Sequence, residues 1–308
     1  MTVAAQSGRR SRDVSGVLLL DKPSGITSHA ALRAAQRLYG ASKAGHTGTL
    51  DPLATGLLPA CFGDATRFAH VLLDAEKTYR AHVLLGVTTS TGDLEGEVTG
   101  RTPVAVTRGD VVAALRRFTG EIMQVPPMYS AIKQDGQPLY KLARAGHVVP
   151  RAPRRVVVTE LSLTGMTERE LDLQIACSKG TYIRVLAEDI GRELGCGACL
   201  SALRRMSVGS LALADGAHPL PALEAMTPEQ RDAVLLPPDA LVASLPRYDL
   251  DAGEVRRITS GQSVERAGIP GTGLTRVYGP DRRFLGLAEV TDLGRIVPRR
   301  LRPQRTGP

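Results

Sequence analysis

Two neighbouring segments near the middle of the chain alternate apolar and polar residues with a period of two. They are RRVVVTELSLTGM at residues 154–166 and ELDLQIACS at residues 170–178, with three residues between them. A period of two places apolar side chains on one face of a strand, and so short a connection allows only antiparallel pairing. Any fold of this chain must therefore accommodate an antiparallel pair of half-exposed strands.

Other segments carry local signals of similar strength. Strand composition is found at 16–20, just before the turn sequence DKPSG, and again at 78–86. Helical spacing with capping residues and glycine stops predicts three helices. These run from Ser28 as the capping residue to Gly40, over 107–120, and over 182–195 with Gly195 as the stop.

The composition changes near residue 219. Residues 219–246 are rich in proline and contain one cation, Arg231, which predicts short helices and a linker. Beyond Arg247, short strands punctuated by glycine predict a small β-domain of roughly 60 residues, a size at which folding is marginal but common. The expected organisation is a disordered basic N-terminus at 1–13, a main domain at 14–245 with a proline- and glycine-punctuated insertion at about 123–150, and a small domain at 246–308.

Charge and hydropathy narrow the choice of partners. The formal net charge is +8, which suits a polyanionic partner. No apolar run approaches the roughly 18 residues that a membrane helix requires. The N-terminus lacks the apolar stretch of a secretory signal. We therefore expect a cytoplasmic protein that does not contact a membrane.

The four cysteines do not indicate a disulfide framework, because the chain carries no export signal. Cys196 and Cys199 form a CxxC pair, but no second pair follows at zinc-finger spacing. We interpret both as small buried residues and expect no metal.

Lysine is rare and unevenly distributed. The chain has six lysines among 39 cations, and all six precede residue 180: Lys22, Lys43, Lys77, Lys133, Lys141 and Lys179. Lysine in a chain that otherwise uses arginine indicates positions that need a compact ammonium on a flexible stem. Chance clustering is the alternative.

One acidic residue, Asp51, lies in HTGTLDPLATGLLP at residues 46–59. The stretch is too rich in glycine, threonine and proline for a long regular element, so we expect Asp51 on a rigid loop that holds one side chain in a fixed direction. Asp before proline is also a common turn former. We find no convincing second carboxylate, Ser/His pair or phosphate-binding glycine loop, so Asp51 is expected to be the single acidic group.

Candidate partners of Asp51 come from other segments. Arg184, in KGTYIRVLAEDIG, would keep Asp51 ionised if the two faced each other, but it would serve equally as a solvated helix residue. Tyr79 and Tyr182 each lie within a few residues of a lysine, as in a pocket that stacks a base and grips its backbone. Each would serve equally as a core tyrosine. His46 would contact phosphate, wedge into a nucleic-acid helix, or cap a turn.

Five blocks taken together resemble one family. DKPSGITSHAALR, GHTGTLDPLATGLLP, EKTYRAHVLLGVTTSTGD, PPMYSAIKQDGQPLYKLAR and CSKGTYIRVLAEDIGRELGCGACLSALRR follow, in order, the motifs of the bacterial TruB family, the tRNA pseudouridine synthases that act on uridine 55. The resemblance covers about residues 16–210. The C-terminal segment is similar, more loosely, to that family's PUA-like RNA-binding barrel.

The resemblance implies an α/β (α+β) catalytic domain with a mixed, mostly antiparallel sheet, followed by a small PUA-like β-barrel. It implies isomerisation of uridine 55 in the T-arm loop of tRNA to pseudouridine, on a flipped-out base and without cofactor or metal. Asp51 matches the family's nucleophile; whether it attacks the sugar or the base stays open. No protein partner is expected, and the protein should act as a monomer.

Motif position also implies roles for other residues. Tyr79 would stack on the target base, while Tyr182 and Arg184 would orient the site and pair with Asp51. The remaining substrate-binding candidates are His46 for holding the flipped nucleotide, Leu203 for lining the uracil pocket, Asp93 for holding the disrupted loop, Lys22 with Pro23 for bracing the active-site loop, and Lys133 in the RNA-clamping insertion.

The sequence is also compatible with two other functions. The chain would be an RNA-binding or tRNA-folding protein if its pocket had lost catalysis, which the intact Asp51, Tyr79 and Arg184 disfavour. A base-excising glycosylase would also place a carboxylate at a glycosidic carbon, but no water-activating group is evident beside Asp51.

Overall fold

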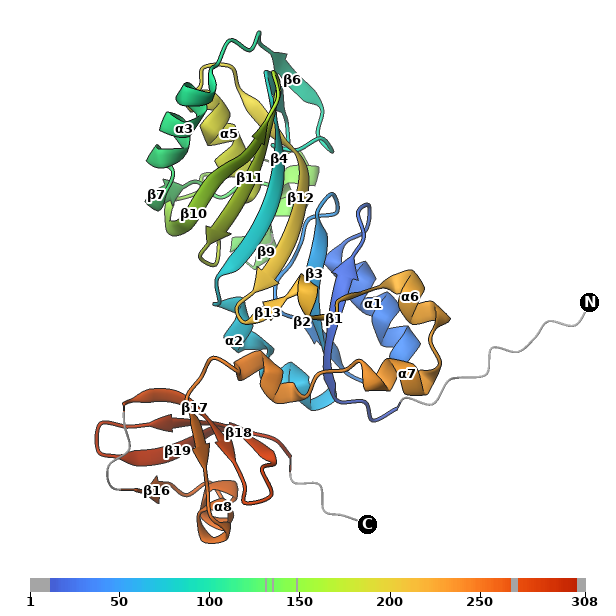
Figure 1. Cartoon of the computed structure of the whole chain (residues 1–308), viewed down its shortest axis with the longest axis vertical. Helices are drawn as coiled ribbons and strands as arrows, with labels where there is room; N and C mark the ends of the chain where they lie inside the picture. The colour runs from blue at the N-terminus through green and yellow to red at the C-terminus, as the bar shows by residue number, and fades with distance from the viewer. Residues whose placement is uncertain (1–11, 131, 135, 148, 267–270, 304–308) are drawn as a thin grey trace, which may run out of the picture.

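The computed structural model describes residues 12–130, 132–134, 136–147, 149–266 and 271–303. Within them, ten strands form one sheet in the order β14-β1-β3-β12-β4-β11-β10-β7, with β13 paired to β12 and β2 to β3 (Figure 1). The strands are β1 (Gly16–Lys22), β2 (Ala44–His46), β3 (Thr55–Phe62), β4 (Lys77–Leu85), β7 (Gly120–Gln124), β10 (Arg154–Met166), β11 (Glu170–Cys177), β12 (Ala198–Val208), β13 (Leu211–Ala212) and β14 (His218–Pro219). Only β1 with β14 and β12 with β3 pair in parallel, which confirms the expected mixed, mostly antiparallel sheet.

The hairpin expected from alternation is present. β10 and β11 pair antiparallel, with register shifts near Val158 and Leu163. β11 also pairs with β4, so it is an interior strand of the sheet. Its last three residues are buried, and the simple alternation ends there because the strand's end lies inside the domain.

Two of the helices share an apolar cluster with the central strands of the main sheet. The helices are α1 (Ser28–Tyr39), α2 (Ala69–Leu73), α3 (Arg108–Arg117), α4 (Leu139–Arg144), α5 (Ile183–Glu193), α6 (Leu220–Ala225), α7 (Pro228–Ala233) and α8 (Ala252–Thr259). α3 and α5 pack on one face of β4, β10, β11 and β12 and share an apolar cluster with them (Figure 1). α5 buries most of its length, including Arg184.

The start of α1 corrects one prediction. Thr27, not Ser28, is the capping residue, because the Thr27 hydroxyl accepts a hydrogen bond from the Ala30 N–H. The predicted end is confirmed, since Gly40 follows with φ of 60°, the left-handed conformation that favours glycine at this position. The hydroxyl of Ser28 is left free to bond elsewhere.

β3 corrects the expectation that residues 46–59 form no long regular element. The strand begins at Thr55 and includes Pro59. β12 pairs with β3 only at Thr55 and Gly56, and β2 pairs with it only from Ala60 on. Pro59 therefore lies where the strand changes neighbours, a place in a sheet that tolerates a residue without an N–H.

Both faces of β1 are buried, which explains its continuous apolar run. Leu18 and Leu20 pack with the apolar residues of α1. Val17 and Leu19 pack on the other face, in a cluster with residues of α2 and of the short helix η3 (Pro238–Val242). The same cluster contains residues of the C-terminal strands.

The C-terminal residues form a second, five-stranded sheet. Its order is β15-β17-β18-β19-β16, with bounds Arg247–Asp249, Gly273–Tyr278, Phe284–Val290, Arg295–Leu301 and Val264–Glu265. Phe284 packs edge-on against Phe68 at 5.1 Å between ring centroids and against Tyr278 at 5.5 Å. An aromatic cluster thus joins this sheet to the segment just before α2. The domain boundary at 245/246 stays a prediction.

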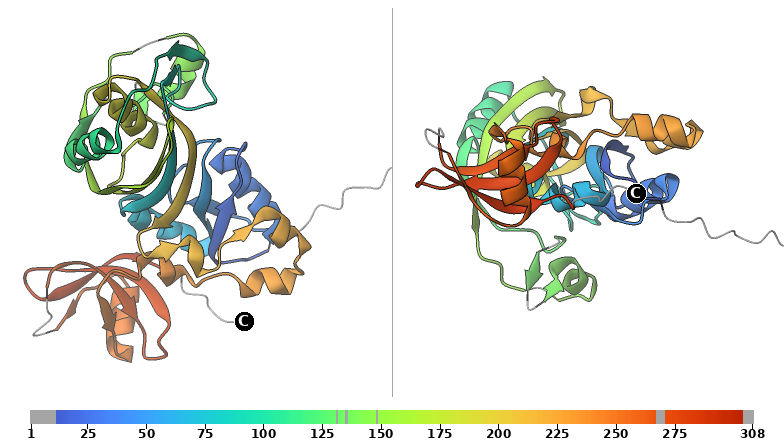
Figure 2. Two further views of the ribbon diagram at one scale, coloured as in Figure 1. Left: turned by 45° about the horizontal axis from the view of Figure 1, so that its top comes forward. Right: turned by 90° about the horizontal axis from the view of Figure 1, so that it is seen from below.

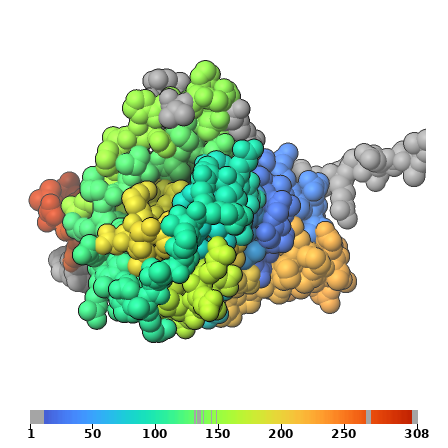
Figure 3. Space-filling view, turned by 90° about the horizontal axis from the view of Figure 1, so that it is seen from above, coloured from blue at the N-terminus to red at the C-terminus, as the bar shows by residue number. Residues whose placement is uncertain are grey.

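The expected insertion forms a small unit of its own. It contains the two-stranded hairpin of β8 (Lys133–Gln134) and β9 (Gln137–Pro138), followed by α4. The unit stands away from the main sheet (Figure 2) and borders the face on which α5 is visible (Figure 3). Most of the expected disordered N-terminus, 1–11, lies outside the described residues.

Three further findings bear on the composition arguments. In the described ranges, no helix is long and apolar enough to cross a bilayer. The same residues contain no group of three or more His, Cys, Asp or Glu arranged to hold a metal. Cys196 and Cys199 are both buried and free.

The close contact between β3 and β12 gives a stability prediction. Gly56 has φ of 98°, and a Cβ there would lie 2.3 Å from the Arg205 carbonyl oxygen. Strain and overlap together should lower the free energy of unfolding of Gly56→Ala by about 2–5 kcal/mol, measured by urea unfolding. Gly216→Ala is the control, because Gly216 has a similar φ of 93° with no atom near its Cβ position. If both variants lost the same free energy of unfolding, the close approach of Gly56 to Arg205 would add nothing to the cost of backbone strain.

Candidate active site

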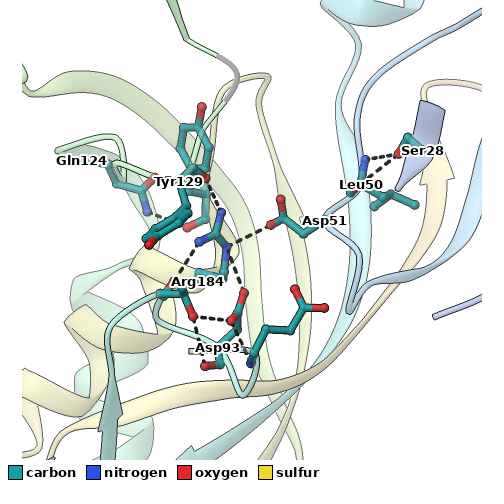
Figure 4. A network of polar contacts seen from close by, with 10 residues as sticks. Ser28, Leu50, Asp51, Asp93, Gln124, Tyr129 and Arg184 are labelled. Atoms are coloured by element: carbon teal, nitrogen blue, oxygen red, sulfur yellow. Dashed lines mark hydrogen bonds and ion pairs between the residues drawn. The ribbon is translucent and has the colours of Figure 1, made fainter. Parts of the chain in front are cut away.

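The loop that carries Asp51 runs between β2 and β3 and is fixed from several sides. Ser28 holds one side of it. The Ser28 hydroxyl accepts a hydrogen bond from the Leu50 N–H at 2.7 Å and donates one to the Leu50 carbonyl oxygen at 3.0 Å (Figure 4). Ser28 is 1% exposed, so these bonds are shielded from water. The sequence suggested a helix cap here; its actual partner is the residue before Asp51.

The residues after Asp51 are held by the turn that follows β1. The Pro52 carbonyl accepts from the Gly25 N–H at 2.9 Å and from Lys22 Nζ at 3.2 Å. The Ser24 hydroxyl donates to the Leu53 carbonyl at 3.1 Å. The backbone on both sides of Asp51 is therefore fixed.

Arg205 holds the loop and strand β3 from the buried side. Its Nη2 donates to the Gly48 carbonyl at 3.1 Å and its Nη1 to the Thr49 carbonyl at 3.4 Å. Its Nε donates to the Leu57 carbonyl at 2.7 Å. Sequence reasoning missed this residue, because its role depends on β12 lying beside β3.

Arg184, in the first turn of α5, lies against Asp51. Its Nε donates to Asp51 Oδ2 at 2.9 Å, while its Nη1 and Nη2 donate to the carbonyls of Thr91 and Tyr129, each at 2.7 Å (Figure 4). The Arg184 side chain is 4% exposed and the Asp51 side chain 41% exposed. The carboxylate is therefore partly open to solvent while its partner is buried, and the rest of the guanidinium fixes two other loops.

A second carboxylate shares this cation. Asp93 Oδ2 lies 3.5 Å from Arg184 Nε, and the Asp93 side chain is only 5% exposed. Its Oδ1 accepts from the Thr91 hydroxyl and from the Glu95 N–H. Burial and the charges of Asp93 and Asp51 raise the pKa of Glu95. The expectation of a single acidic group was therefore wrong: Asp51 and Asp93 both pair with one guanidinium.

Tyr182 is placed through its backbone at the start of α5. Its N–H donates to Gln124 Oε1 at 3.0 Å, and its carbonyl accepts from Gln124 Nε2 at 3.4 Å. Gln124 is 2% exposed and lies at the end of β7. Burial raises the pKa of Tyr182. Gln124 was not anticipated, since a lone glutamine carries no sequence signal.

Tyr79 and Leu203 belong to the apolar cluster that underlies the loop. Tyr79 lies on β4 and Leu203 on β12, and both are buried in one cluster with Leu50 and Ile183. Burial raises the pKa of the Tyr79 phenol, so the ring is neutral at physiological pH. The structure thus brings both residues beside the Asp51 loop.

The other candidates have varied settings. His46 ends β2, and its Nδ1 accepts from the Gly48 N–H at 3.3 Å, as in a turn cap. Burial and the nearby Arg205 lower the pKa of His46, so its ring is neutral at pH 7. Lys133 lies on β8, and its side chain is outside what the structure describes.

Two of the six lysines are buried and bind backbone carbonyls. Lys22 Nζ donates to the carbonyls of Pro23 at 2.8 Å and Ile26 at 2.7 Å, in addition to Pro52. Lys77 Nζ donates to three carbonyls at and after the end of α2. A compact ammonium with three donors suits such sites. At these two positions, the use of lysine is explained by hydrogen bonds to backbone carbonyls inside the protein.

Comparison with known proteins gives consistent matches along the chain. Residues 36–183 match the model described as "TruB family pseudouridylate synthase (N terminal domain)". Residues 184–243 match "tRNA pseudouridylate synthase B C-terminal domain", and residues 246–301 match "Pseudouridine synthase II TruB, C-terminal".

Two relatives, each named tRNA pseudouridine synthase B, cover most of the chain. The protein from Methylobacillus flagellatus is 50% identical over 96% of this chain and 98% of its own length. The protein from Ralstonia nicotianae is 56% identical over 89% of this chain and 88% of its own.

Solved structures show the same fold. The chain described in "Crystal Structure of a Cbf5-Nop10-Gar1 Complex" is 26% identical with a TM-score of 0.73, over 94% of this chain and 85% of that chain. Fold and site together with these matches place the protein among the pseudouridylate synthases. Within that class, the chain belongs to the TruB family.

The attachment of Leu50 gives a second stability prediction. Ser28→Ala leaves the buried Leu50 N–H without a partner, which should lower the free energy of unfolding by about 1–3 kcal/mol. Amide hydrogen exchange of Leu50 should accelerate as well. Thr27→Ala is the control: loss of the helix cap should cost about 1 kcal/mol without altering exchange at Leu50. Unchanged Leu50 exchange in Ser28→Ala would contradict the proposed anchor.

Proposed function

We propose that this protein isomerises uridine 55 in the T-arm loop of tRNA to pseudouridine, with Asp51 as the nucleophile. The observation that carries the proposal is a half-exposed carboxylate on a braced loop, ion-paired to the buried Arg184. Membership of the TruB family supports the reaction, and the names of the relatives support tRNA as the substrate.

The geometry suits attack by a fixed group. Arg184 contacts Asp51 through one nitrogen, so the carboxylate keeps lone pairs that can face a substrate. The ion pair sets its direction before substrate arrives, and such prior orientation is a large part of enzymatic rate enhancement. The solvent-exposed side of Asp51 supplies access for the ribose or the base of a flipped-out nucleotide.

The reaction itself conserves all atoms. The bond between C1′ of the ribose and N1 of uracil breaks, the base turns, and a bond from C1′ to C5 forms. The C5 proton is lost and N1 carries one in the product. Tyr79 and Leu203, which pack in the apolar cluster beside the Asp51 loop, would contact the uracil while it turns.

Binding must offset the cost of extracting the base. Flipping a nucleotide out of a folded loop costs a few kcal/mol. Phosphate contacts by the cations of a chain with net charge +8 can supply this free energy. We assign the T-arm contacts to the insertion at about 123–150, which carries Lys133, and we assign holding of the flipped nucleotide to His46.

The proposed organisation follows from these assignments. Residues 14–245 would form the catalytic domain and residues 246–308 a PUA-like RNA-binding domain. The protein would act as a cytoplasmic monomer on tRNA, without a protein partner, a cofactor or a metal.

The nucleophile assignment is tested with an unmodified tRNA transcript. Asp51→Asn should reduce pseudouridine formation by at least about a thousandfold, as is typical when a nucleophile is removed. Its affinity for tRNA should stay within a few-fold of the wild type. Asp232→Asn is the control, because Asp232 also pairs with an arginine, Arg12, outside the site. Turnover by Asp51→Asn would remove the nucleophile assignment, and wild type that binds without isomerising would favour the non-catalytic RNA-binding function.

The role of Arg184 is tested by a substitution that keeps its charge. Lysine cannot reach Asp51, Thr91 and Tyr129 at once, because it has one head group instead of a planar fork. We expect Arg184→Lys to lower kcat by roughly 100-fold with tRNA affinity within a few-fold. Arg192→Lys, on the exposed side of the same helix, should leave kcat unchanged. Wild-type kcat in Arg184→Lys would show that the pair is dispensable.

A further inference from the structure

Arg205 is a buried cation without a carboxylate partner. It is 1% exposed and ranks first by volume among the fully buried side chains. In the part of the chain that the structure describes, no Asp or Glu lies within ion-pair distance of it. Burying a charge without a counter-ion is costly, even when its N–H groups are bonded. Such a residue needs a reason beyond filling space.

The hydrogen bonds of Arg205 point to the Asp51 loop. Two of its three carbonyl partners, Gly48 and Thr49, lie three and two residues before Asp51. The third, Leu57, lies on β3 just after the loop. The guanidinium therefore ties both ends of the loop to β12.

Arg205 also lies beside Tyr79. The two residues are opposite each other in the antiparallel pairing of β12 with β4, and opposite residues point to the same face of a sheet. Burial raises the pKa of the Tyr79 phenol, and the positive charge of Arg205 acts against that rise. The Tyr79 ring therefore lies on the same face of the sheet as the guanidinium that holds the Asp51 loop.

A second buried arginine shows what a purely structural role looks like. Arg231 is 7% exposed and also donates to backbone carbonyls, those of Leu38 and Met226. It ties α7 to the end of α1, and none of its partners belongs to the Asp51 loop. Both arginines are buried and donate to backbone carbonyls, but Arg205 holds the Asp51 loop and Arg231 holds a helix end outside the site.

We infer that Arg205 is a positioning residue for the proposed reaction, fixing the Asp51 loop and the ring of Tyr79 relative to each other. The inference rests on the proposed function. Arg205 would keep the distance between the nucleophile, Asp51, and the stacking ring of Tyr79 constant while RNA binds and the base turns.

Three variants separate these contributions: Arg205→Met, Arg205→Lys and Arg231→Met. The readouts are single-turnover rate on a tRNA transcript, tRNA affinity, and Tm. Arg205→Met should lose roughly 100-fold in rate, the cost of a small misplacement of reacting groups. Its affinity should stay within a few-fold, and Arg205→Lys, which keeps the charge, should recover part of the rate. Arg231→Met should lose Tm while its rate below Tm matches the wild type.

The outcomes are distinguishable. If Arg205→Met and Arg231→Met both lose Tm and both keep the wild-type rate, Arg205 is only structural and the inference is overturned. If Arg205→Met does not fold, a wild-type rate in Arg205→Lys at full occupancy of tRNA overturns it instead. A wild type that never isomerises the transcript contradicts the proposed function, whereas a normal wild-type rate with an unaffected Arg205→Met contradicts only this inference.

Discussion

One guanidinium joins the parts of the protein that make up the site. Arg184 contacts Asp51 on the β2–β3 loop, Asp93 and the Thr91 carbonyl on a second loop, and the Tyr129 carbonyl at the start of the insertion. Because the group is buried, its bonds face little competition from water, and losing any partner would leave a charge or a carbonyl unsatisfied. The relative positions of three loops and α5 therefore depend on this side chain.

The backbone around the site is held by buried cations that donate to carbonyls. Lys22 binds the turn after β1 and reaches Pro52, Arg205 holds the other side of the Asp51 loop, and Lys77 closes the end of α2 just before the strand of Tyr79. Irregular loops leave carbonyls without ladder partners, and a cation with several donors satisfies more than one of them. The site can thus be rigid without regular secondary structure.

Much of the local structure could be predicted from the sequence. Alternation gave the β10–β11 pair, and helical spacing with Gly40 and Gly195 gave two helices close to their observed bounds. Asp51 and Arg184 were singled out, but their contact rested on resemblance. Ser28 was assigned to the helix cap, and Asp93 was not expected at the same cation, because a hydroxyl or carboxylate has several possible partners and composition does not choose among them.

Sequence by itself determined the periodic elements, their caps and the residue types available for chemistry, because these depend on interactions within a few residues along the chain. Only the tertiary structure decided that Asp51 meets Arg184, 133 residues away, and that Arg205 lies beneath both the loop and Tyr79. Those contacts depend on strand order and register, with β12 between β3 and β4. Register is set by the packing of whole sheet faces, so no single segment specifies it.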